Sequence, residues 1–433
     1  MRLPAVFLFL SLVFVCAASA QTPATSEHPQ ASAGQAVTQY VLPPDKLAKA
    51  KTLYTTQVVL MIVETIYGFL VLLFLVRGRV GSKFRNWAES VTRQRFVQAF
   101  LIVPPILFIL SALNLPFDIY GHKTYLEYGI SVQGWGSWFW DWTKSQLVQF
   151  AIFSPVIWLL YVIIRVSPRR WWLYFWLASI PIVVFVTFIA PVILDPIFNK
   201  FEPLEKTNPA LVTAIQGVTK RGGLDIPPER MYEMKASEKV TDYNAYVTGM
   251  GATKRVVVWD TTEHDMTTPE ILFVFGHEMG HYVLGHIWKG ILFLSGMLFV
   301  AFYLGYRIAK AILSRWGERL GIREMADWAS LPLLLLIVSG LAFLGTPIGS
   351  TFSRHVEHQA DIYGLEVVHG LVPNSSQTAA VAFQKLGEKS FDYPYPNQFL
   401  VFWAYNHPSI PDRLLFSLAY KPWDEGKPNQ YVK

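Results

Sequence analysis

The sequence predicts a mainly α-helical membrane protein with six or seven transmembrane helices and a soluble part that contains a small β-sheet. Three observations support this fold class. The 433 residues are 52% hydrophobic and 15% aromatic. Only 16% are charged, against about 25% in an ordinary soluble protein. Six apolar runs are long enough to cross a bilayer, and short alternating runs typical of strands follow the fourth of them.

Each long apolar run can cross a hydrocarbon layer of about 30 Å as a helix. Internal prolines such as Pro104, Pro105 and Pro155 are expected to kink some of these helices without abolishing them. One or two such runs could be buried helices of a soluble protein, but six indicate a membrane domain. The runs are Val58–Val76, Phe96–Leu115, Leu147–Ile164, Trp171–Leu194, Gly290–Ala309 and Leu331–Ile348.

The N-terminal segment differs from these runs. Arg2, the short apolar stretch Ala5–Val15 and the small residues Ala18-Ser19-Ala20 are typical of a cleavable signal peptide, although the segment could also be a first transmembrane helix. Its removal would take away Cys16, the only cysteine, which excludes disulfides and cysteine-ligated metal from the mature chain. The expected divisions are 1–20 (signal peptide or first helix), 21–55 (flexible leader and approach to the membrane), 56–194 (four helices) and 195–433 (with spans at about 290–309 and 331–348).

Basic residues in three short loops predict the orientation of the chain. Placing these loops in the cytoplasm puts residues 195–289 and 350–433 on the extracytoplasmic side. The net charge of +6 arises largely from the same loops, so it gives no support for nucleic-acid binding. The three clusters are Arg77, Arg79, Lys83, Arg85, Arg93 and Arg95; Arg165, Arg169 and Arg170; and Arg307, Lys310, Arg315, Arg319 and Arg323.

Short runs between the fourth and fifth spans predict a small sheet. Met231–Met234, Ala245–Val247 and Arg255–Trp259 are expected to be strands, with Gly249 and Gly251 in the turn that joins the last two. An unpaired sheet edge beside a metal site can hold an extended peptide through backbone hydrogen bonds. An ordinary hairpin strand explains this segment equally well.

The pentapeptide His277-Glu278-Met279-Gly280-His281 predicts a metal site on a helix. Four helical residues advance about 400°, so both imidazoles project from one face and can share one ion. Glu278 lies about 100° from His277, close enough to act on a water molecule beside the metal. We expect Thr268 to cap this helix and Pro269 to lie in its first turn.

A catalytic zinc site needs a third protein ligand. His286 lies nine positions after His277, about 180° round the helix, and so cannot join the same ion. On a second helix Glu357 could be the third ligand, and Asp361, one turn later, could accept a proton from a ligating imidazole and fix its tautomer. A solvated acidic face is the alternative. One Zn²⁺ per chain is expected, with manganese or cobalt as possible replacements.

These residues occur in an order that resembles the type I CAAX prenyl protease family, the integral-membrane zinc endopeptidases of the gluzincin class. The resemblance covers nearly the whole chain from about Thr38. Its motifs are Asp195 to Leu204, Asn244-Ala245-Tyr246, Lys254 to Thr261, His277 to His281, Ser353-Arg354 with Glu357 and Ala360-Asp361, and finally His407-Pro408 with Arg413.

The resemblance implies a gluzincin-type zinc metalloprotease domain. It implies zinc on His277, His281 and Glu357, with Glu278 as general base and Asp361 supporting a ligand. His407 and Arg413 match positions near the metal, where positively charged donors could stabilise an oxyanion. Asn244, Ala245 and Tyr246 match a segment that faces substrate. Family members enclose the site in a chamber of seven transmembrane helices with the catalytic domain facing the cytoplasm, whereas the loop charges of this chain predict the opposite side.

The sequence therefore predicts a zinc-dependent membrane endopeptidase embedded in the lipid bilayer. Its expected substrate is a prenylated C-terminal peptide or a membrane-associated protein, and no nucleic acid is expected. A noncatalytic membrane chaperone or receptor with a structural zinc is the main alternative, although a structural site would need no glutamate beside the first histidine. A transporter is weaker, because the polar residues group into one soluble site. The oligomeric state stays open.

Overall fold

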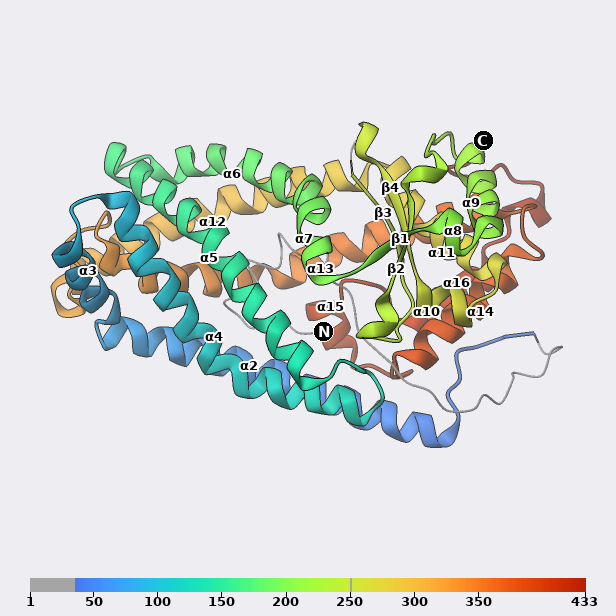
Figure 1. The fold of residues 1–433 in the computed structure, drawn as a ribbon, viewed down its shortest axis with the longest axis horizontal. Helices are drawn as coiled ribbons and strands as arrows, with labels where there is room; N and C mark the ends of the chain where they lie inside the picture. Colours follow the sequence, from blue (N-terminus) through green and yellow to red (C-terminus); the bar gives the residue numbers. More distant parts are fainter. Residues whose placement is uncertain (1–35, 250) are drawn as a thin grey trace.

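The computed structural model describes residues 36–249 and 251–433, so the predicted signal peptide or first helix at 1–20 lies outside the described residues. The molecule is elongated, with its long helices running roughly along the long axis (Figure 1). A small sheet and several shorter helices gather toward one end, and the short helix α3 lies at the other. The membrane helices and the sheet thus occupy different parts of the molecule.

Six helices in the described part of the chain are long and apolar enough to cross a membrane. At about 1.5 Å per residue, the longer ones exceed a hydrocarbon layer of about 30 Å and extend beyond it. Pro104, Pro105 and Pro155 lie inside continuous helices, as expected. The six are α2 (Pro44–Arg77), α4 (Arg95–Glu127), α5 (Trp135–Val166), α6 (Trp171–Phe188), α12 (His286–Leu320) and α13 (Leu331–Val368).

The fourth predicted span ends earlier than expected. Helix α6 stops at Phe188, and a separate helix, α7 (Ala190–Phe198), follows Ile189. Pro191 lies at the start of α7, where it has no N–H to continue the hydrogen-bond ladder of α6. The remaining α-helices of the described residues are α3 (Val80–Val91), α8 (Leu204–Thr207), α9 (Pro209–Arg221), α10 (Asp260–Asp265), α11 (Thr268–Val283), α14 (Ser375–Lys389), α15 (Gln398–Ala404) and α16 (Ile410–Ala419).

The sheet has four strands in the order β1-β2-β4-β3. Three were predicted: β2 (Met231–Met234), β3 (Ala245–Thr248) and β4 (Arg255–Trp259), whereas the short edge strand β1 (Phe201–Pro203) was not. Strand β4 pairs parallel to β2 and antiparallel to β3, and β1 pairs antiparallel to β2. The β3–β4 turn requires glycine at position 249, because its φ is +89° and a Cβ atom would lie 2.1 Å from the Thr253 carbonyl oxygen. The strand order places β1 at one edge of the sheet and β3 at the other.

The two faces of the sheet pack against different parts of the molecule. Ala245, Val256 and Val258 belong to the large core that also contains Phe273, Phe275 and Met279 of α11. Val257 and Trp259 alternate with them and face a separate small cluster on the other side. The side chains of the sheet thus fix α11 over one face only.

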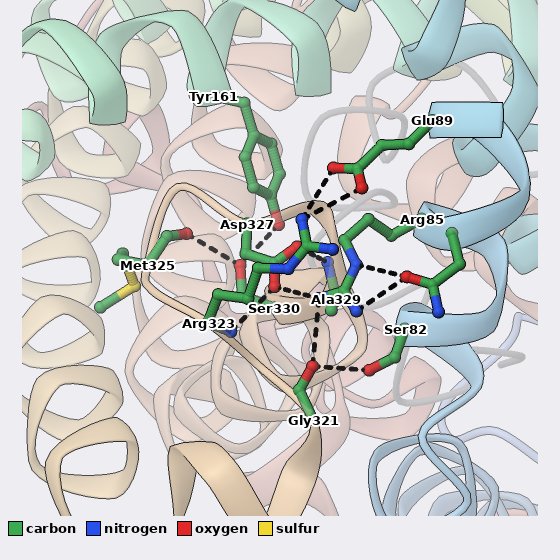
Figure 2. Close-up of polar contacts among 11 residues, drawn as sticks. Ser82, Arg85, Glu89, Tyr161, Gly321, Arg323, Met325, Asp327, Ala329 and Ser330 are labelled. Carbon is green, nitrogen blue, oxygen red and sulfur yellow. Dashed lines mark hydrogen bonds and ion pairs between the residues drawn. The ribbon is translucent and has the colours of Figure 1, made fainter. Parts of the chain in front are cut away.

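At the far end, the turn between α12 and α13 docks against α3 through a network of polar contacts (Figure 2). Asp327 in this turn pairs with Arg85 of α3, and both side chains are buried. Ser82 of α3 donates to the Gly321 carbonyl at 2.8 Å, and Tyr161 of α5 lies 2.7 Å from the hydroxyl of Ser330. These contacts close the end of the molecule opposite the sheet.

Candidate metal centre and active site

Helix α11 begins with a capping box that sets the direction of the helix. The Glu270 carboxylate accepts a hydrogen bond from the backbone N–H of Thr267 at 2.7 Å, and Lys385 of α14 donates to the same oxygen at 2.8 Å. The cap is therefore Thr267, and the prediction of Thr268 was wrong by one residue. The reason is that Glu270 stands three residues after Thr267, as the capping box requires. Pro269 lies in the first turn, as predicted.

Two glycines bring α11 and α13 unusually close together. A Cβ atom on Gly364 of α13 would lie 3.0 Å from the backbone nitrogen of His277. A Cβ atom on Gly276 of α11 would lie 2.8 Å from a methyl group of Val367. Without these side chains the helices pack backbone against backbone, and α13 can present its carboxylates directly to the histidines of α11.

His277, His281 and Glu357 converge on one point. The two Nε2 atoms lie 3.2 Å apart. The Glu357 carboxylate oxygens lie 3.3 Å from His277 Nε2 and 3.4 Å from His281 Nε2. Ligand atoms at about 2.0–2.1 Å from a tetrahedral zinc ion lie about 3.3 Å from one another. The three observed separations therefore fit one zinc ion held by two imidazoles and a carboxylate.

Glu357 also has an unsatisfied oxygen at this point. Its Oε2 atom is buried and has no hydrogen-bond partner among the described residues. A buried carboxylate oxygen without a donor is costly, and a bound cation removes that cost. Among the described residues, the side chains of His277, His281 and Glu357 form a group whose ligand atoms lie close enough together to share one metal ion.

Asp361 lies behind His277, as the spacing on α13 predicted. Its Oδ1 atom is 2.8 Å from His277 Nδ1, which leaves the Nε2 atom of that ring facing the metal position. Arg413 of α16 donates to both Asp361 oxygens, at 2.9 and 2.6 Å, and its Nη2 atom lies 3.9 Å from Glu357. The arginine thus fixes the carboxylate that orients the first histidine.

His281 is oriented by a residue whose role the sequence did not reveal. Its Nδ1 atom lies 3.2 Å from Nδ1 of His286, and Nε2 of His286 lies 2.9 Å from the side-chain oxygen of Gln359. The prediction that His286 does not join the metal group agrees with this arrangement. The helix does not continue to His286, because Gly285 has a φ of +68° and separates α11 from α12. Gly285 was the residue in the sequence that could have predicted the end of α11 before His286.

His407 reaches the same site from the loop before α16. Its Nε2 atom lies 3.3 Å from the Glu357 carboxylate, and its side chain is 45% exposed. Ser409 begins α16 by accepting a hydrogen bond from the backbone of Asp412, which places Arg413 in the first turn of that helix. The structure therefore brings His407 and Arg413 to the Glu357 carboxylate.

Glu278 follows the first histidine and is half-buried. Burial raises the pKa of its carboxyl from 4.5 to about 7. Burial alone would lower the pKa of the neighbouring His277, but the Asp361 and Glu357 carboxylates raise it to about 10. The two carboxylates therefore stabilise a positive charge on His277, whereas burial lowers the pKa of His281 to about 3.

The three predicted substrate-facing residues divide between the two faces of β3. The backbone of Asn244 is fixed by Thr262, whose hydroxyl donates to the Asn244 carbonyl at 2.9 Å. Ala245 is fully buried in the core that contains α11. The ring of Tyr246 lies on the opposite face, where its hydroxyl donates to Asp195 at 3.1 Å. The structure thus brings Ala245 to the metal helix but not the Tyr246 side chain.

A site of two histidines and a carboxylate, with a glutamate beside the first histidine, defines a metalloprotease, and the six apolar helices place it in the membrane-embedded class. The family description "Peptidase family M48" matches residues 205–416. A second, "CAAX prenyl protease N-terminal, five membrane helices", matches residues 27–200. The chain belongs to the type I CAAX prenyl protease family within peptidase family M48, and it is a membrane metalloendopeptidase.

Individual relatives agree with this assignment. The chain is 37% identical to the uncharacterized metalloprotease YhfN of Bacillus subtilis strain 168, over 80% of this chain and 79% of the relative. It is 24% identical to the CAAX prenyl protease 1 homolog of Homo sapiens, over 80% of each chain. Its fold matches the crystal structure of S. mikatae Ste24p with a TM-score of 0.76 over 96% of each chain, at 21% identity. The predicted family, fold class and enzyme class are thereby confirmed.

Proposed function

We propose that this protein is a zinc-dependent endopeptidase in which His277, His281 and Glu357 hold one Zn²⁺ ion per chain. The separations of 3.2 to 3.4 Å among their ligand atoms carry this proposal. The buried Glu357 oxygen without a hydrogen-bond donor among the described residues supports it. A structural zinc would have a closed shell of four protein ligands, whereas this group offers three and leaves room for substrate.

The residues around the ion have distinct tasks in peptide hydrolysis. Zinc, when bound, polarises the scissile carbonyl and makes water more acidic. Glu278 accepts a proton from the attacking water and passes it to the leaving amine. Asp361 holds His277 in the tautomer that binds metal. His407 and Arg413 would donate to the oxyanion that develops on the carbonyl oxygen when water attacks the carbonyl carbon.

We propose that the substrate binds as an extended strand along β3, the edge of the sheet nearest α11. Both backbone groups of Asn244 are already used, because its N–H donates to the Thr262 hydroxyl and its carbonyl accepts from the Trp259 N–H. The backbone of Ala245, whose side chain is buried, would therefore make this contact. The substrate is a peptide with a prenylated C-terminus, as the names of several relatives indicate, or another membrane-associated protein. Incubation with a farnesylated CAAX peptide and with β-casein, which carries no prenyl group, tests whether cleavage requires prenylation.

The loop charges support an extracytoplasmic catalytic domain. Three arginine-rich loops lie on the side opposite to α11 and the sheet, and such loops stay in the cytoplasm. Prenylated CAAX proteins belong to the cytoplasmic face, so this orientation favours a different membrane-associated substrate. A reporter fused after Lys433 decides the question, and a cytoplasmic C-terminus would contradict the charge argument.

The experiment that tests the proposed function is the substitution Glu278→Gln. It removes the base but no metal ligand, so we expect zinc content to stay at the wild-type level while hydrolysis falls about 10²- to 10⁴-fold. Glu205→Gln, at an exposed position on α8, is the matched control and should leave activity unchanged. Wild-type turnover by Glu278→Gln would refute the role of this residue.

A further inference from the structure

Arg354 of α13 connects the metal helix pair to α15. It lies three residues before Glu357 and seven before Asp361, so all three project toward the same side of α13. Its Nη1 atom donates to the carbonyl oxygens of Val401 at 2.8 Å and Tyr405 at 2.6 Å. One face of α13 therefore contacts both the metal position and the end of α15.

The carbonyls that Arg354 binds lie at the C-terminal end of α15, where the Val401 carbonyl also accepts the Tyr405 N–H at 3.3 Å. Helix α15 ends at Ala404, and Tyr405 has extended backbone angles of φ −79° and ψ 120°. The last carbonyls of a helix need an external donor, and a guanidinium there also complements the helix dipole. Nη2 of Arg354 donates to the Thr351 hydroxyl at 3.0 Å, which fixes the plane of the guanidinium.

The segment from Tyr405 to Arg413 is consequently attached to α13 at both ends. Arg354 binds its first residue, and Asp361 binds its last through two hydrogen bonds. His407 lies between these attachments, and its Nε2 atom is 3.3 Å from Glu357. The His407 side chain is 45% exposed and its Nδ1 atom lies 2.9 Å from the side-chain oxygen of Asn406, so the ring is held by a residue of the same attached segment.

We propose that Arg354 is a positioning residue that fixes the end of α15 so that the His407 imidazole faces the Glu357 carboxylate. This inference rests on the proposed function, in which His407 acts on the substrate carbonyl. A lysine would be a poor substitute, because one ammonium group cannot bind two carbonyls and the Thr351 hydroxyl in the planar geometry of a guanidinium.

A double-mutant cycle tests the inference. The variants are Arg354→Met, His407→Gln and the double variant, assayed for kcat and KM on whichever of β-casein and the farnesylated peptide the wild type cleaves. We expect Arg354→Met to lower kcat about 10-fold or more, with KM and zinc content unchanged, because a small misplacement of a catalytic group is costly. The double variant should be no slower than His407→Gln, since Arg354 acts through that residue. Arg354→Lys should recover only part of the loss.

Hydrogen exchange of the metal-free protein gives a readout that does not depend on turnover. Arg354→Met should speed exchange across residues 398–409 and leave α11 unchanged. If Arg354→Met does not fold, Thr351→Val replaces it in the test. Thr351 is exposed, and its substitution removes the hydrogen bond to the Arg354 guanidinium, so kcat should fall to a smaller extent.

The outcomes separate this inference from the proposed function. Multiplicative losses in the cycle, or wild-type kcat in Arg354→Met, would overturn the role of Arg354 while leaving the zinc site intact. Wild-type kcat in His407→Gln would overturn both the role of His407 and that of Arg354. Failure of the proposed peptidase function would appear separately, as wild-type turnover by Glu278→Gln.

Discussion

Two buried carboxylates at opposite ends of the molecule show how a structural charge differs from a functional one. Asp327 joins the turn before α13 to α3, and its side chain is 3% exposed (Figure 2). Its Oδ2 atom accepts from the Arg85 guanidinium and from the Arg323 backbone N–H at 2.9 Å, and its Oδ1 atom accepts from the Ala329 N–H at 3.1 Å. Both oxygens are satisfied by the protein.

The side chain of Glu357, on α13, is also buried, at 9% exposed, but one of its oxygens lacks a hydrogen-bond donor from the described residues. Its Oε2 atom has no hydrogen-bond donor in the part of the chain that the structure covers, although two imidazoles lie 3.3 Å away. The comparison teaches that burial and charge alone do not identify a functional carboxylate. Glu357 differs in that its oxygen without a donor lies beside two imidazoles with which it could share a metal ion.

The largest expected effect comes from Glu357→Gln. A neutral amide is a poor zinc ligand, so purified protein should lose stoichiometric zinc, and peptide hydrolysis should fall by at least about 10³-fold. Zinc is measured by inductively coupled plasma mass spectrometry, and folding by the thermal melt in detergent. Wild-type zinc content in this variant would mean that Glu357 is not a ligand.

Asp327→Ala should lower the stability of the protein without changing its zinc content or its kcat. It leaves the buried Arg85 guanidinium without its partner, which costs about 3–5 kcal/mol of unfolding free energy. Zinc content and kcat per folded molecule should stay unchanged, because the site lies at the other end of the molecule. Glu89→Gln is the control, since its pair with Arg323 is more exposed and should contribute at most about 1 kcal/mol. A selective loss of kcat in Asp327→Ala would link the two ends.

The sequence predicted those features of the fold and of the site that depend on a local residue pattern. The apolar runs predicted the spans, and His277, His281, Glu357 and Asp361 followed from helical spacing and ligand chemistry. The break after Phe188 and the cap at Thr267 were misplaced by one to six residues, because neighbouring threonines or apolar residues satisfy the same local pattern.

The remaining features depend on contacts between distant segments. The contact of Arg354 with Tyr405 joins residues 51 positions apart, and the contact of His286 with Gln359 joins residues 73 apart. Nothing in the local pattern around either residue specifies its partner. Strand β1 was missed for a related reason: it has three residues and ends in proline, so it is defined only by pairing with β2.

Gly364→Ala should weaken the metal end by separating its two helices. The added methyl group would lie 3.0 Å from the His277 backbone nitrogen, so α13 must shift and carry Glu357 with it. We expect zinc affinity to fall about 10- to 100-fold and stability by about 1–3 kcal/mol. Gly349→Ala on the same helix is the matched control, because no heavy atom lies within 4 Å of its added Cβ. Equal zinc affinity in the two variants would refute the close-packing argument.

The smallest expected effect is a change of kcat/KM with pH. Glu278 acts as a base only when ionised, so kcat/KM should fall as the pH drops through its pKa. Burial raises that pKa from 4.5 to about 7, and a bound cation lowers it again, so the acid limb should lie between these values. The limb should be absent from the residual activity of Glu278→Gln. Its persistence there would assign it to another group.

X-ray absorption spectroscopy at the zinc edge tests the central claim most directly, because it reports the ligands of the metal in the intact protein. We predict one zinc per chain in wild-type protein, with two imidazole nitrogens and a carboxylate oxygen among its ligands, and loss of this signal in Glu357→Gln. A wild-type spectrum without imidazole scattering, or one that Glu357→Gln leaves unchanged, would contradict the account.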